Sequence, residues 1–174
     1  MSRVEYDLTT IKGIVFDIDG VLSPSTIPMD SEGVPMRMVN IKDGYALQLA
    51  VRMGLKIAII TGGKEEAIRK RYMALGITDV FLGSAQKLPI LEKWAKDMEL
   101  AMNEIAYMGD DIPDLQCLRA VGLSTCPHDA AWEVKSECRY ISPFTGGYGC
   151  GRDLIEQVLR TQGLWLADHR AFGW

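Results

Sequence analysis

The sequence lacks any long hydrophobic run, because its uninterrupted apolar stretches fall far short of the ~20 residues that a membrane-spanning helix needs. It also lacks an excess of positive charge. Its 19 Lys and Arg residues against 23 Asp and Glu residues give a net charge of −4, which disfavours a general surface for nucleic acid or anionic membrane. The first residues contain no apolar segment typical of a signal peptide. We therefore expect a cytoplasmic protein with neither a nucleic-acid nor a membrane partner.

Cysteine is scarce, and its spacing does not suggest a metal site. The four cysteines contain no Cys-x-x-Cys pair; they are Cys117, Cys126, Cys138 and Cys150. This spacing disfavours a zinc site, and a cytoplasmic setting favours free thiols over disulfides.

Short apolar runs alternate with helical patterns along nearly the whole chain. A length of 174 residues, with 48% apolar and 24% charged residues, suits one globular domain spanning 1–174. Runs typical of buried strands lie at 11–15, 57–60, 80–82, 105–108, 121–124 and 140–142, and helical patterns at 65–75, 88–98 and from about 153. Repeated β-α-β units predict an α/β fold, a Rossmann-like three-layer α/β/α architecture with a mainly parallel sheet.

Residues 22–40 interrupt this alternation. They are rich in proline and glycine, and 30–33 has the composition of a turn between two short extended pieces. We predict a β-hairpin flap that projects from the ligand-binding edge of the sheet. Its apolar side chains either fold onto the sheet or pack against another subunit, and we expect a subunit contact.

Acidic side chains follow directly on predicted strands. Three strand ends and one helix start carry the candidate chemistry: Asp17 and Asp19, then Thr61 and Gly62, then Asp110 and Asp111 with Asp114 nearby, and Lys87. In a parallel sheet these ends meet along one edge, where open α/β sheets bind ligands. Such close carboxylates repel one another without a cation, and an all-oxygen ligand set favours Mg²⁺.

Each of these features alone has an ordinary explanation. A strand-ending Thr-Gly is often only a turn, a lysine at a helix start is often only solvated, and Gly-Asp-Asp can be a simple helix cap. Their order and their common position at strand ends favour phosphoryl transfer, because an anion-binding turn, a cation and a carboxylate nucleophile would lie together.

These residues resemble the four ordered motifs of the haloacid dehalogenase-like phosphatases. The motifs are 17–21, Thr61-Gly62, Lys87 and 109–114. The segment 40–45 and the glycine-rich segment 146–153 resemble the capless branch of that family, which acts on phosphorylated sugar acids. The resemblance covers about residues 10 to 163 and implies the family's fold.

The resemblance implies catalytic roles for Asp17, Asp19, Thr61 and Lys87. Asp17 would form an aspartyl-phosphate. Asp19 would protonate the departing sugar oxygen and then activate water. Thr61 and Lys87 would hold the phosphoryl group.

The resemblance also implies Mg²⁺ as the cofactor. Asp17, the backbone carbonyl of Asp19 and Asp110 would hold the ion, with Asp111 also at the metal and Asp114 orienting nearby groups.

A 3-deoxy-2-ulosonic acid phosphate is the implied substrate class, with 3-deoxy-D-manno-octulosonate 8-phosphate expected and a role in lipopolysaccharide biosynthesis. The implied substrate contacts are Asp19, Asn40, Ile41, Lys42, Asp43, Gly44, Thr61, Gly62, Arg71 and Lys87. Arg71 is a plausible partner for the sugar-acid carboxylate. The resemblance further implies a homotetramer, in which the flap and the tail at 164–174 contact neighbouring subunits.

Alternatives remain open. The family often carries arginine where this chain has Gly63, and arginine or a similar residue near Gln48, so a 2-keto-3-deoxynononate 9-phosphate phosphatase or another sugar phosphatase is the nearest competitor. A phosphotransferase or mutase would need an enclosing cap, for which the stretch between Gly63 and Lys87 is too short. A non-catalytic oligomerisation domain would not need clustered carboxylates, which destabilise a fold.

Overall fold

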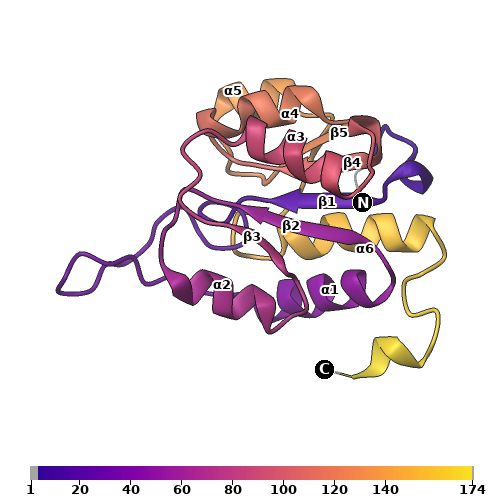
Figure 1. The fold of residues 1–174 in the computed structure, drawn as a ribbon, viewed down its shortest axis with the longest axis horizontal. Coiled ribbons are helices and arrows are strands. Elements are labelled where there is room, and N and C mark those ends of the chain that lie inside the picture. Colours follow the sequence, from indigo (N-terminus) through magenta and orange to yellow (C-terminus); the bar gives the residue numbers. More distant parts are fainter. Residues whose placement is uncertain (1–3, 174) are drawn as a thin grey trace.

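A six-stranded parallel sheet forms the centre of the computed structural model, which describes residues 4–173 (Figure 1). The strand order is β3-β2-β1-β4-β5-β6, and every pairing is parallel. The strands are β1 (Gly13–Phe16), β2 (Lys56–Ile60), β3 (Asp79–Phe81), β4 (Ile105–Met108), β5 (Leu123–Cys126) and β6 (Tyr140–Ile141). The predicted α/β fold with a mainly parallel sheet is confirmed.

Helices cover both faces of the sheet (Figure 1). One face carries α3 (Leu88–Asp97), α4 (Leu115–Ala120) and α5 (Trp132–Glu137), and the other carries α1 (Ile41–Arg52), α2 (Glu66–Met73) and α6 (Cys150–Thr161). Each face buries its own core because side chains of a strand alternate. In β1, Ile14 and Phe16 join one core and Val15 joins the other. In the described part of the chain, no helix combines the length and apolarity needed to cross a membrane.

The order of the strands creates a switch point beside β1. The chain runs outward from β1 through β2 to β3, then returns to the other side of β1 as β4. Connections therefore leave the carboxyl ends of β1 and β4 in opposite directions, which opens a crevice where such sheets bind ligands. Phe16 pairs with Met108 in register, so β1 and β4 end side by side.

Several elements differ from the sequence-based expectation. The fifth strand occupies Leu123–Cys126 instead of 121–124, because Val121 caps α4 and an added Cβ at Gly122 would lie 2.5 Å from the Asn103 carbonyl oxygen. Helix α6 starts at Cys150 instead of 153. Helices α1, α4 and α5 were not predicted. Two of them have only six residues, too few to show a clear helical period, and α1 contains a glycine.

The flap projects from the sheet as an extended loop (Figure 1). The predicted turn at 30–33 is present: Asp30 accepts from the Gly33 amide through its carbonyl and from the Glu32 and Val34 amides through its carboxylate. Only one isolated antiparallel bridge, Met29 with Pro35, joins its two arms. Prolines lack the amide proton that a longer ladder would need, so the flap stays sparsely hydrogen-bonded. Its methionines and valines are 41–67% exposed.

The C-terminal tail packs on α1 and α6 of the same chain. Tyr45 donates its hydroxyl proton to the Ala171 carbonyl over 2.5 Å, and Ala171 is 3% exposed. The Trp165 ring lies edge-on to Tyr45 and faces the guanidinium groups of Arg152 and Arg160, whose Cζ atoms lie 4.8 and 5.6 Å from the ring centroid.

These contacts predict that Trp165→Ala lowers the free energy of unfolding by about 1–2 kcal/mol, because an aromatic edge contact and two cation–π contacts are lost. Urea denaturation followed by circular dichroism measures it. Trp132→Ala is the matched control, because Trp132 is 77% exposed and its loss should change stability by less than about 0.5 kcal/mol. Equal effects of the two substitutions would contradict the packing role.

Candidate active site

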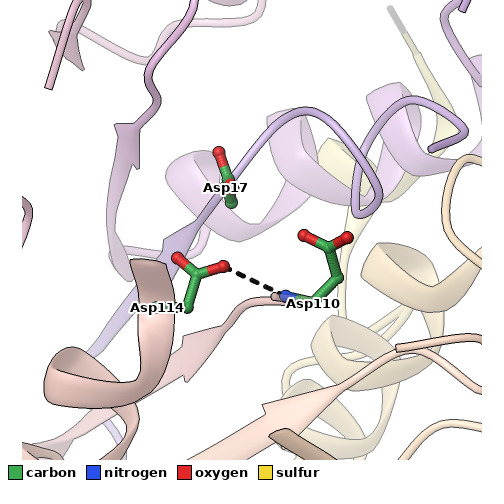
Figure 2. Close-up of side chains that lie close together, drawn as sticks. All are labelled: Asp17, Asp110 and Asp114. Atoms are coloured by element: carbon green, nitrogen blue, oxygen red, sulfur yellow. Dashed lines mark hydrogen bonds between the residues drawn. The ribbon is translucent and has the colours of Figure 1, made fainter. Parts of the chain in front are cut away.

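Three carboxylates converge at the carboxyl edge of the sheet. Asp17 follows β1, Asp110 follows β4, and Asp114 ends the short 3₁₀ turn η3 (Ile112–Asp114) (Figure 2). One oxygen atom from each carboxyl group lies within 4.8 Å of the others. The in-register ends of β1 and β4 bring the first two together, as the sequence predicted.

Asp114 organises this group of carboxylates. Its Oδ1 atom accepts from Lys87 Nζ over 2.8 Å and from the Tyr107 hydroxyl over 2.7 Å. Its Oδ2 atom accepts from the Asp110 amide over 3.1 Å, the bond drawn in Figure 2. Asp114 is 1% exposed. Because protein groups occupy both oxygens, this side chain is suited to fixing the loop that carries Asp110.

Lys87 supplies the positive charge at the centre. Its Nζ atom lies 2.6 Å from Asp17 Oδ2 and 2.8 Å from Asp114 Oδ1, and the side chain is 4% exposed. Burial alone would lower the pKa of Lys87, but the two carboxylates outweigh it and raise that pKa. The lysine is therefore a permanent cation.

The single positive charge of Lys87 does not neutralise the negative charge of the three carboxylates. Burial raises the pKa of Asp17 to about 6, helped by the Asp114 carboxylate and opposed by Lys87. Burial, with the charges of Asp17 and Asp114, raises the pKa of Asp110 to about 8. Both carboxylates are costly to ionise, and a divalent cation between them would remove that cost. The carboxylate donor set fits Mg²⁺.

Gly20 makes the approach of Asp110 possible. Its φ of +83° is a left-handed conformation that favours glycine, and an added Cβ would lie 1.9 Å from Asp110 Oδ2. The glycine of the first motif is therefore a steric requirement of the acidic group.

All predicted catalytic and metal residues line one cleft of about 460 Å³. Its lining comprises Asp17, Asp19, Ser25, Thr61, Gly62, Gly63, Ser84, Ala85, Lys87, Asp110, Asp111, Pro113 and Asp114. Thr61 is 1% exposed, and its hydroxyl accepts from the Gly63 amide over 3.2 Å. No group among residues 4–173 bonds the Gly62 amide, which leaves a donor for an anion. Asp111 lines the cleft but does not join the three converging carboxylates.

The predicted substrate contacts at 40–44 lie outside this cleft. Asn40 caps α1 by accepting from the Lys42 amide over 2.9 Å. Asp43 is 2% exposed and accepts from the Arg152 amide over 2.7 Å, so it caps α6. Ile41 and Lys42 are exposed, and Gly44 is buried. The capping bonds thus hold Asn40 and Asp43 in place at the starts of two helices.

Arg71 lies in a second cavity, of about 260 Å³, between the flap and α2. Its guanidinium packs closely over Gly44, where an added Cβ would lie 2.6 Å from Nη2.

Sequence reasoning missed Arg37, which lines the same cavity and forms an ion pair with Asp19. Its only signal in the sequence is a cation within an otherwise apolar arm of the flap. Ser25 and Ser84 of the cleft were also missed, because isolated serines in loops carry no pattern.

Converging carboxylates beside a buried lysine at the switch point of a parallel sheet suit metal-assisted phosphoryl transfer. Comparisons with known proteins agree: the family of haloacid dehalogenase-like hydrolases matches residues 65–149. The chain belongs to this family, and it is a phosphatase, a phosphoric monoester hydrolase.

Several relatives of this chain are phosphatases of 3-deoxy-D-manno-octulosonate 8-phosphate. The 3-deoxy-D-manno-octulosonate 8-phosphate phosphatase KdsC of Escherichia coli K12 is 33% identical over 153 residues, which cover 88% of this chain and 81% of the relative. The Moraxella catarrhalis phosphatase of the same name, solved in complex with magnesium, phosphate and KDO, superposes with a TM-score of 0.86 at 32% identity over 90% of both chains. The cobalt-bound Haemophilus influenzae phosphatase gives a TM-score of 0.87 at 29% identity, covering 90% of this chain and 92% of that one.

The carboxylate group predicts a pH-dependent response to Mg²⁺. Millimolar Mg²⁺ should raise the thermal unfolding temperature, and more at pH 8.5 than at pH 6.5, because protons compete for Asp110 as the pH falls through its raised pKa of about 8. Differential scanning fluorimetry measures the shift. Asp110→Asn should lose most of the Mg²⁺-induced shift, and Asp97→Asn, at an exposed position, should keep all of it. An equal shift in both variants would refute the metal site.

Asp43 predicts a second pH effect, on the fold itself. Burial raises the pKa of Asp43 from 3.8 to about 6, so the folded state favours the protonated carboxyl group. The protein therefore loses stability as the pH rises from about 4 to about 6. Asp43→Asn keeps an oxygen acceptor without the charge. It should be more stable than the wild type by about 2–3 kcal/mol above pH 6.5 and no more stable below pH 4. Chemical denaturation at several pH values tests this, and a pH-independent difference would contradict it.

Proposed function

We propose that this chain is a Mg²⁺-dependent phosphatase that hydrolyses a 3-deoxy-2-ulosonic acid phosphate, specifically 3-deoxy-D-manno-octulosonate 8-phosphate, to the free sugar acid and phosphate. One observation carries the proposal: Asp17, Asp110 and Asp114 converge around Lys87 in a cleft that also holds Asp19 and Thr61. The relative with magnesium, phosphate and KDO bound supports the substrate class.

In this proposal Asp17 is the nucleophile. The Ile18 amide donates to its Oδ1 over 2.6 Å and Lys87 Nζ to its Oδ2 over 2.6 Å, which fixes the carboxylate in the cleft. A carboxylate oxygen attacks phosphorus, the bond from phosphorus to the sugar oxygen breaks, and Asp19 gives that oxygen a proton. Asp19 then takes a proton from water, whose oxygen attacks the aspartyl-phosphate and releases inorganic phosphate.

Mg²⁺ would be held by Asp17, Asp110 and the backbone carbonyl of Asp19, with Asp111 at the same cleft as a further predicted contributor. When bound, the ion neutralises charge on the phosphoryl oxygens. Asp114 serves in this account as an organiser, because Lys87 and Tyr107 already occupy one of its oxygens.

The phosphoryl group would lie between Lys87 and the turn at Thr61. The Thr61 hydroxyl and the Gly62 amide can donate to its oxygens, and Lys87 contributes a fixed positive charge.

The sugar acid would extend from the cleft toward the flap. Arg71, in the neighbouring cavity, suits a carboxylate. Segment 40–44, whose Asn40, Asp43 and Gly44 lie beside Arg71, would contribute further contacts. We also propose that residues 1–174 form one domain that assembles as a cytoplasmic homotetramer in lipopolysaccharide biosynthesis, with the exposed flap and the tail at subunit contacts. The exposed methionines of the flap support such a contact.

Phosphate release from a panel of phosphorylated sugar acids tests the function. We expect the highest kcat/KM with 3-deoxy-D-manno-octulosonate 8-phosphate, dependence on Mg²⁺, and a loss of about 1,000-fold or more in Asp17→Asn. Asp97→Asn is the surface control. A preference for the nine-carbon 2-keto-3-deoxynononate 9-phosphate would overturn the substrate assignment but not the proposed mechanism. Undiminished activity of Asp17→Asn would overturn the mechanism.

A further inference from the structure

Arg37 joins three separate parts of the chain at the mouth of the cleft. It lies on the second arm of the flap and donates from Nε and Nη2 to the two oxygens of Asp19 over 2.6 and 2.8 Å. Its Nη1 atom donates to Glu65 Oε2 over 2.7 Å, at the start of α2. The Arg37 side chain is 11% exposed, whereas the methionines on either side of it in the flap are at least half exposed. The flap therefore rests on the body of the protein through this guanidinium.

The surrounding residues leave space for this side chain. An added Cβ at Gly63 would lie 2.9 Å from Arg37 Nη2 and 2.8 Å from Ile68 Cδ1. A larger residue at position 63 would require the side chains of Arg37 and Ile68 to shift. The absence of a side chain at Gly63 thus leaves room for the guanidinium of Arg37, which lies beside the turn at Thr61.

Asp19 depends on this contact for its orientation. Its side chain is 36% exposed at the edge of the cleft. Within residues 4–173, both hydrogen bonds to its carboxylate come from Arg37. By contrast, Asp17 and Asp114 are held by several buried partners each. A bidentate arginine pair fixes the plane of a carboxylate, which one point charge does not.

We propose that Arg37 is a positioning residue, which holds the flap against the cleft and fixes the carboxylate of Asp19 for the second step, in which Asp19 takes a proton from water, with Glu65 as the second anchor. The inference rests on the proposed function, since it assigns a task to the residue that orients the acid–base group. The position of the flap and the orientation of Asp19 are coupled, because the same guanidinium makes both contacts.

Steady-state kinetics of the full chain with Mg²⁺ test the proposal on two substrates. One is p-nitrophenyl phosphate, which has no carboxylate, and the other is 3-deoxy-D-manno-octulosonate 8-phosphate. Arg37→Ala should lower kcat by about 10-fold or more on both substrates and change KM by less than about 3-fold, because the loss concerns the reacting geometry and not substrate binding. Arg37→Lys should restore part of kcat, and Glu65→Gln should cause a smaller loss than Arg37→Ala.

The controls separate positioning from folding. Lys70→Ala removes an exposed cation of α2 and should leave both constants unchanged. Thermal unfolding temperatures show whether each variant is folded; if Arg37→Ala is not, Arg37→Lys and Glu65→Gln carry the comparison. Unchanged kcat in folded variants, or a rise in KM confined to the sugar acid, overturns the proposal. A wild-type chain that hydrolyses neither substrate refutes the proposed function instead.

Discussion

The buried contact of Lys87 with Asp17 and Asp114 is the interaction on which the site depends. Without that cation, the three carboxylates at the carboxyl edge of the sheet would repel one another in a poorly solvated cleft. Lys87 balances only part of their charge, and burial keeps the pKa values of Asp17 and Asp110 high. The remaining negative charge favours a divalent cation, and a bound cation together with Lys87 would in turn offset the charge of a phosphoryl group.

The sheet and one glycine bring the carboxylates of the site together. The parallel register ends β1 and β4 together, and the left-handed Gly20 lets the first loop pass close over Asp110. The fold therefore presents acids from distant parts of the sequence as one group. Arg71 lines a second cavity between the flap and α2, next to the cleft. Arg37 of the flap also lines that cavity, but it reaches Asp19 of the cleft itself, so the flap is tied to the chemistry through this one residue.

Much of this arrangement could be predicted from the sequence. Apolar runs that end in acids or Thr-Gly identify buried strands and their chemistry, so the six strands and the charged residues of the cleft were predictable, whereas Ser25 and Ser84 were not. The short helices α4 and α5 were not, because six residues hold too little periodicity. The ion pair of Arg37 with Asp19 joins positions 18 residues apart through a loop, and no local pattern encodes such a contact. The bond from the Arg152 amide to Asp43 joins positions 109 residues apart and was unpredictable for the same reason.

The central claim is that Asp17 and Asp110 share one Mg²⁺ while Asp17 accepts the phosphoryl group. A crystal structure of the chain with Mg²⁺ and beryllium fluoride, a phosphoryl mimic, tests it most directly. We predict a metal about 2.1 Å from oxygens of both aspartates and beryllium bonded to Asp17. A metal bound elsewhere, or beryllium fluoride on another residue, would contradict the account.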